Sequence, residues 1–142
     1  MRSVAASVFL CALACDPFGE FQVNTYPTLS SAQSDHLFER GWLPEVLPAG
    51  SGPIVEAHDL DTNARCSKSV FPADASAQVS QALLALGFQA FSGELPPLPF
   101  SRCPFSLERA RSSESAFINT RGADSDREFA VIGGCVLYFW SS

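Results

Sequence analysis

The sequence predicts an α+β fold: a small antiparallel sheet of about four strands, formed by two hairpins, with one main helix packed on one face. Two pairs of strand-like segments, at residues 54–71 and 115–140, each contain polar turn residues. A segment with helical periodicity, residues 75–86, lies between them. Because strands and helix are segregated along the chain, α+β packing is favoured over alternating βαβ units. We expect this single domain to cover residues 34–142.

The first elements of the domain are predicted from capping residues and prolines. Ser34 can cap a short helix over residues 35–40, and Gly41 can end that helix in the left-handed conformation. Trp42 and Pro44 then open a WLPEVLP segment, in which each proline holds the preceding residue extended. We expect a rigid elbow that Trp42 attaches to the core.

The first hairpin is predicted over residues 54–59 and 64–71. The Asp-Thr-Asn stretch that ends at Asn63 separates the two strands, and Asp and Asn favour turns because their side chains bond to nearby backbone amides. Asn63 is therefore expected to have a structural role in this turn.

The main helix is predicted over residues 75–86, with Asp74 as its N-cap. Its apolar residues recur at i, i+3, i+4 and i+7, which gives one buried face. Gly87 is expected to end it, with Phe88 contacting Leu83 in a Schellman motif.

The remaining segments complete the second hairpin. Four prolines in residues 92–105 exclude a regular element there. Strands are expected over residues 115–121 and 128–140, separated by a polar turn. Gly133 and Gly134 mark a bulge or bend in the last strand, which carries apolar side chains on both faces.

The N-terminus has the features of an export signal. Arg2 gives a positive start, and residues 4–13 form a mostly apolar run without charge. A membrane-spanning helix needs roughly 20 apolar residues, so this run is too short to span a bilayer. Residues 1–14 are therefore predicted to be a signal peptide.

A small-residue motif precedes Cys15. Ala12-Leu13-Ala14 resembles a bacterial lipobox, with alanine where leucine is usual, and the same bond also fits ordinary signal peptidase. We expect lipidation of Cys15 and a membrane-anchored lipoprotein on the periplasmic side, with residues 15–33 as a tether or first extended segment. The alternative is a soluble periplasmic or secreted protein.

Charge and cysteine content limit the partners. The formal net charge of −6 argues against binding to nucleic acid, because an acidic domain repels phosphates. Export implies an oxidising compartment, where Cys66, Cys103 and Cys135 can form one bridge and leave one thiol. Their spacing does not choose among the three pairings.

The densest polar cluster is in the first hairpin. Asp59, Asp61 and Asn63 match the first three positions of a calcium loop, but glycine and the closing glutamate are missing further on. Glu56 and His58 would share a strand face, where a transition metal could use them only with a third ligand. Glu56, His58, Asp59 and Asp61 are thus weak metal candidates, and the simpler interpretation is a polar hairpin.

No motif for nucleophilic catalysis or phosphate binding is present, so we expect no enzyme and no cofactor. The sequence favours a non-catalytic binding or structural module at the cell envelope, with a membrane anchor and an envelope protein as partners. The alternative is a metal- or small-ligand-binding domain centred on Glu56, His58, Asp59 and Asp61.

A pattern across the elbow and the hairpin resembles a family. Gly41-Trp42-Leu43-Pro44-x-x-Leu47-Pro48, then Ile54, then His58-Asp59-Leu60-Asp61-Thr62-Asn63, is similar to small uncharacterised bacterial exported proteins. The family often has aromatic residues after the turn, where this chain has Arg65-Cys66-Ser67-Lys68-Ser69. The resemblance implies a shared elbow and hairpin but no particular activity.

Overall fold

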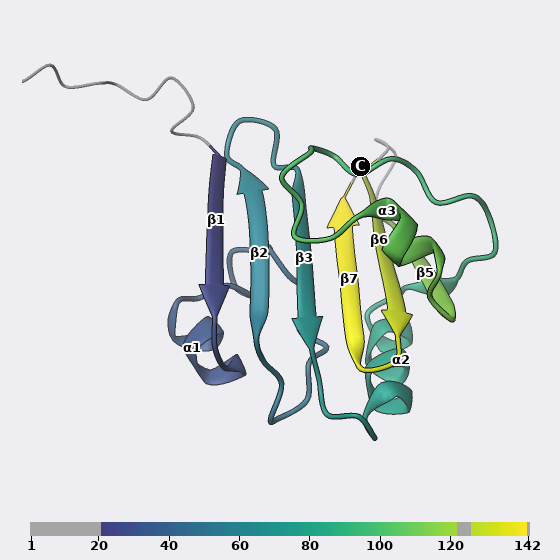
Figure 1. The fold of residues 1–142 in the computed structure, drawn as a ribbon, viewed down its shortest axis with the longest axis horizontal. Coiled ribbons are helices and arrows are strands. Elements are labelled where there is room, and N and C mark those ends of the chain that lie inside the picture. Colours follow the sequence, from purple (N-terminus) through teal and green to yellow (C-terminus); the bar gives the residue numbers. More distant parts are fainter. Residues whose placement is uncertain (1–20, 122–125, 142) are drawn as a thin grey trace, which may run out of the picture.

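The protein is built on one antiparallel sheet of seven strands, in the order β1-β2-β3-β7-β6-β5-β4 (Figure 1). The computed structural model describes residues 21–121 and 126–141. The strands are β1 (Phe21–Tyr26), β2 (Ile54–Asp59), β3 (Arg65–Val70), β4 (Gln89–Ala90), β5 (Ser115–Arg121), β6 (Asp126–Gly133) and β7 (Val136–Ser141), and the helices are α1 (Leu29–Ser34), α2 (Ser76–Ala85) and α3 (Leu107–Arg111).

The α+β prediction of about four strands with one main helix is wrong, because the fold is mainly β. β1 and β4 add strands where the sequence pattern was weak. The expected long last strand is also two strands, β6 and β7, which pair with each other. The β3–β7 ladder joins the N-terminal and C-terminal parts of the chain into one sheet, a pairing between distant segments that no local pattern contains.

Several local predictions are confirmed. β2, β3, β5 and α2 lie within one residue of their expected bounds. At the end of α2, Gly87 has a φ of 95° and the Phe88 amide donates to the Leu83 carbonyl. This is the expected Schellman motif, and both Phe88 and Leu83 are buried.

Two predicted helix starts are wrong. Residues 35–40 form hydrogen-bonded turns, whereas the helix α1 lies just before them, with Thr28 and Ser31 in a reciprocal capping box. α2 has Ala75 at its N-cap position, and no side chain caps it. Residues 15–33, expected to be a tether or a first extended segment, contain β1 and most of α1 within their described part.

The hairpin between β6 and β7 depends on the glycine pair. Gly134 has a φ of 61°, and Gly133 pairs with Val136 next to the turn. The turn changes which residues share a face, so Phe129 packs in one core cluster and Phe139 in the other. A continuous strand over residues 128–140 would have placed these two side chains on one face.

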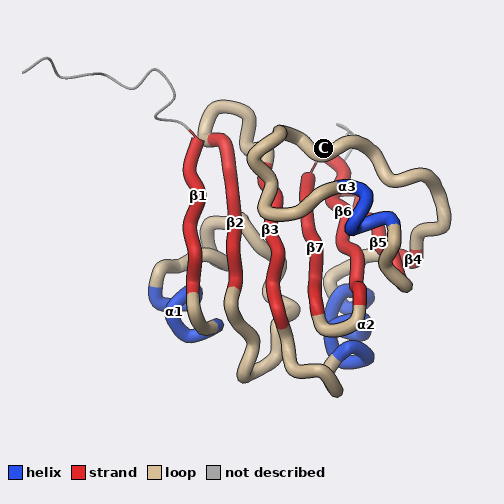
Figure 2. Tube along the Cα trace, in the orientation of Figure 1, coloured by secondary structure: helices blue, strands red, loops and turns tan. Residues whose placement is uncertain are grey.

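Each face of the sheet is covered by its own layer (Figure 2). In that view α2 lies behind the sheet, while the irregular segment after β4 and α3 cross its front. The back cluster joins residues from α1, the elbow and α2 to the sheet, including Leu37, Leu43, Val79, Leu83 and Phe139. The front cluster includes Leu95, Ala110, Phe129, Tyr138 and Trp140.

A disulfide attaches the front layer to the sheet. Cys66 in β3 is bonded to Cys103, with 5.7 Å between their Cα atoms, and Cys66 is fully buried. Cys135 is a half-buried free thiol. The structure therefore selects one of the three pairings that the sequence left open.

None of the helices in the described ranges, 21–121 and 126–141, is long and apolar enough to cross a bilayer.

Candidate functional site

A polar cluster is buried on the back face of the sheet, on β1 and β2. Glu56 and His58 are 1% and 3% exposed. His58 Nδ1 lies 2.8 Å from Glu56 Oε2, and the Asn24 side-chain amide donates to Glu56 Oε1 at 2.6 Å. Both carboxyl oxygens of Glu56 therefore have a partner, one in Asn24 of β1 and the other in His58 of β2.

The strand geometry accounts for this cluster. Glu56 and His58 are two residues apart in β2, so they point to the same face. The β1–β2 register places Asn24 opposite Glu56. A buried carboxyl group without partners is costly, and these two contacts satisfy it.

The elbow is attached to this cluster through Trp42. The Trp42 and His58 rings are stacked, with centroids 3.9 Å apart and planes 9° from parallel. Leu43 next to it is buried in the back core. The indole covers one face of the imidazole, which is almost fully buried.

A second polar group lies beside the first, across the middle of the sheet. Arg65 is opposite His58 in the β2–β3 register and forms an ion pair with Glu128. Glu128 Oε2 accepts a hydrogen bond of 3.2 Å from Asn119, and the Arg65 guanidinium lies 5.7 Å from the centroid of the Phe139 ring. The Arg65 guanidinium is thereby held by an ion pair and by a contact with an aromatic ring.

A groove of about 420 Å³ opens over these residues, between the elbow, the first-hairpin turn and the end of α2. The Arg65–Glu128 pair and Trp42 are among the residues that line it. His58 does not line it. The groove combines aromatic, aliphatic and charged side chains and is lined by Phe38, Arg40, Gly41, Trp42, Leu43, Pro44, Glu45, Asn63, Arg65, Leu86 and Glu128.

The predicted metal candidates are only partly brought together. Asp59 Oδ1 accepts hydrogen bonds from the amides of Asp61 and Thr62, and the Asp61 side chain is exposed in the turn. Glu56 and His58 lie together in the sheet. Throughout the part of the chain that the structure describes, no group of three His, Cys, Asp or Glu side chains could hold a metal ion.

The predicted structural residues meet at the groove. Trp42, Pro44 and Asn63 all line it, and Asn63 has a φ of 56°, a conformation that asparagine tolerates in turns. Cys15, the predicted lipidation site, lies outside the described residues.

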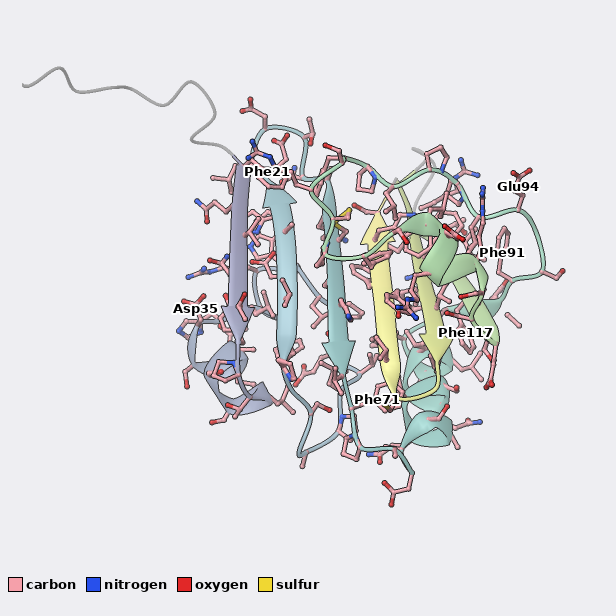
Figure 3. The ribbon with its side chains drawn as sticks, viewed as in Figure 1. Phe21, Asp35, Phe71, Phe91, Glu94 and Phe117 are labelled. Atoms are coloured by element: carbon pink, nitrogen blue, oxygen red, sulfur yellow. A yellow bond between two sulfur atoms is a disulfide. The ribbon has the colours of Figure 1, made fainter. Side chains whose placement is uncertain are left out.

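Another carboxyl group lies beside the C-terminal end of β1, where Figure 3 labels Asp35. The Tyr26 hydroxyl donates to Asp35 Oδ2 at 2.5 Å. Burial of the ring and then this hydrogen bond raise the pKa of Tyr26 well above its usual value of 10.0. The contact ties β1 to the turn that follows α1.

Sequence reasoning missed four residues of these clusters: Asn24, Arg65, Asn119 and Glu128. Asn24 lies in a segment that was expected to be partly a tether, although its FQVNTY sequence is typical of a strand. Glu128 and Arg65 are 63 residues apart, so only the β3–β7–β6 order brings them together.

Residues 20–69 match the family model of the YbbD head domain. The match covers about a third of the chain and contains β1, α1, the elbow and β2, with nearly all of β3. The match supports similarity to a small bacterial family of uncharacterised function. The motif of the elbow and turn, over residues 41–63, stays a prediction. Comparisons with curated proteins and with solved structures find no match.

Proposed function

We propose that this protein is a non-catalytic binding module of the cell envelope, held at the membrane through a lipid on Cys15, which binds an envelope protein in the groove. The observation that carries the proposal is the groove beside a buried polar cluster whose groups are already engaged with one another. Glu56 bonds to Asn24 and His58, and Trp42 covers His58. A ligand would therefore meet the residues that line the groove, and not the buried Glu56–His58 pair.

The chemistry of the groove suits a short peptide segment of a protein partner. Phe38, Trp42 and Leu86 offer apolar surface, while Asn63 and Arg65 offer polar groups for backbone amides and carbonyls. Hot spots of protein interfaces are enriched in tryptophan and arginine, and both are present here. Two aromatic side chains and a fixed guanidinium therefore favour peptide recognition.

Export is supported by the disulfide. A Cys66–Cys103 bridge persists in an oxidising compartment and is rare in the cytosol. This supports the signal-peptide interpretation of residues 1–14 independently of the N-terminal sequence. Labelling cells with a fatty acid tests the anchor: we expect incorporation into the native chain and none into Cys15→Ser, and an unlabelled native chain would contradict it.

The groove is tested with a photo-crosslinking amino acid at Leu86, in cells that express the full chain. Leu84 is the matched control. Leu84 and Leu86 lie at the end of α2, and their exposed fractions are 44% and 42%, respectively. Only Leu86 lines the groove. We expect a discrete protein adduct from position 86 that position 84 does not give. Equal adducts from both positions, or none from either, would contradict binding in the groove.

A further inference from the structure

The two edges of the sheet differ in how they are protected. The β4 edge has only two residues, and a very short edge strand offers little to a partner. The β1 edge has six residues, FQVNTY, without charge, proline or bulge, although natural proteins commonly use such devices to block edge pairing. β1 lies at the outer side of the sheet in Figure 1, with β2 as its only ladder partner among the described residues.

Side chains in the middle of β1 are exposed to solvent. Val23 is 53% exposed, more than any other large apolar side chain in the described residues. Gln22 and Thr25 are exposed as well. No backbone group of Phe21–Tyr26 takes part in a hydrogen bond outside the strand ladders, as far as residues 21–121 and 126–141 show.

We propose that β1 pairs with β1 of a second copy, in antiparallel orientation about a two-fold axis, and so joins two sheets into one. A self-pairing strand must meet no like charge across the axis. β1 carries none, whereas the chain as a whole has a net charge of −6 that opposes contact between copies elsewhere. β1 therefore brings no charge of its own to the axis, and the charged groups at its two ends, Arg102 over Phe21 and Asp35 at Tyr26, are of opposite sign.

The pleat of β1 limits which side chains can face each other across the two-fold axis. Antiparallel strands across a two-fold axis that runs through one continuous sheet place residues of the same face opposite each other. With Val23 on the axis it faces Val23 of the second copy, Gln22 faces Asn24, and Phe21 faces Thr25. This register buries the most exposed apolar side chain against itself, which is a favourable cross-strand contact.

The experiment is sedimentation of the full chain carrying Cys15→Ser, which cannot be lipidated, over a range of protein concentrations. We expect a reversible monomer–dimer equilibrium. Val23→Lys places two ammonium groups across the axis and should weaken the dimer about tenfold or more. Leu84→Lys, a similarly exposed apolar position on α2, should leave the dimer unchanged. Near-ultraviolet circular dichroism checks that both variants are folded.

A monomer at every concentration would overturn the proposal, as would a dimer that Val23→Lys and Leu84→Lys weaken equally. Oxidative crosslinking gives a second measurement, in a Cys15→Ser, Cys135→Ser background. Val23→Cys should form a disulfide-linked dimer and Leu84→Cys should not. Failure of Val23→Cys to crosslink in a chain that dimerises would overturn the Val23-centred register.

Discussion

The two faces of the sheet are held together in different ways. The front face has an aromatic cluster, in which Phe129 contacts both Trp140 and Phe91, and a disulfide between Cys66 and Cys103. The back face has apolar packing as well, but near β1 and β2 it also buries a carboxyl group and an imidazole. Both faces bury apolar area, but the front face adds a covalent link, whereas the back face adds polar groups that must find particular partners.

This difference indicates where a binding surface can develop. Apolar contacts are not directional, so the front layer needs only suitable volume and the disulfide. Polar groups in the back layer fix the positions of Trp42 and Arg65, because each has a directional contact or a stacking partner. The groove lies over these positioned residues, on the face where the geometry is specified.

Loss of the front aromatic cluster should have the largest effect. Phe129 is 1% exposed, so Phe129→Ala should lower the free energy of unfolding by about 4 kcal/mol through lost apolar burial and a cavity. Denaturant unfolding with the disulfide intact measures it. A loss below about 1 kcal/mol would mean that the front cluster can rearrange around the cavity.

Removal of the disulfide should come next. The bridge closes a sequence separation of 37 residues, and the double variant Cys66→Ser, Cys103→Ser should lose about 3–4 kcal/mol because the unfolded chain gains freedom. Cys135→Ser is the control, since that thiol is free and half-buried. Equal losses in the two variants would contradict a specific role for the bridge.

The back-face cluster should be disrupted by Glu56→Ala. Asn24 and His58 would both lose a buried partner, and we expect a loss of about 3 kcal/mol. Glu56→Gln keeps the shape and an acceptor for Asn24, so it should cost less. If Glu56→Ala changes stability by less than about 1 kcal/mol, the cluster does not order this face.

The smallest expected effect is at Tyr26, and it depends on pH. Because the pKa of Tyr26 is raised in the folded protein, the folded state keeps a proton that the unfolded chain loses above pH 10.0. The free energy of unfolding should therefore fall as pH rises through 10. Tyr26→Phe should lose about 1–2 kcal/mol at neutral pH, from the missing hydrogen bond to Asp35.

Unfolding at pH 9 and pH 11 tests the titration itself. Tyr26→Phe has no phenol to titrate at this position, so its stability should decline less than that of the native chain over this interval. Parallel declines in the two proteins would show that other groups cause the alkaline loss.

Elements with local sequence signals could be predicted without knowledge of the fold. The first hairpin follows from strand-like residues around an Asp-Thr-Asn turn, and α2 ends at Gly87 because glycine accepts a positive φ there. β1 was recognisable only as an extended segment, since an edge strand that is partly exposed has little apolar periodicity.

The sheet order, the disulfide and the composition of the groove depend on contacts between distant segments. Cys66 could have paired with either of two cysteines, and the crossing of the front layer places Cys103 beside it. Arg65 and Glu128 meet because β7 lies between β3 and β6. Such contacts join distant segments, and their partners are chosen by how all the strands pack together, which no short stretch of sequence specifies.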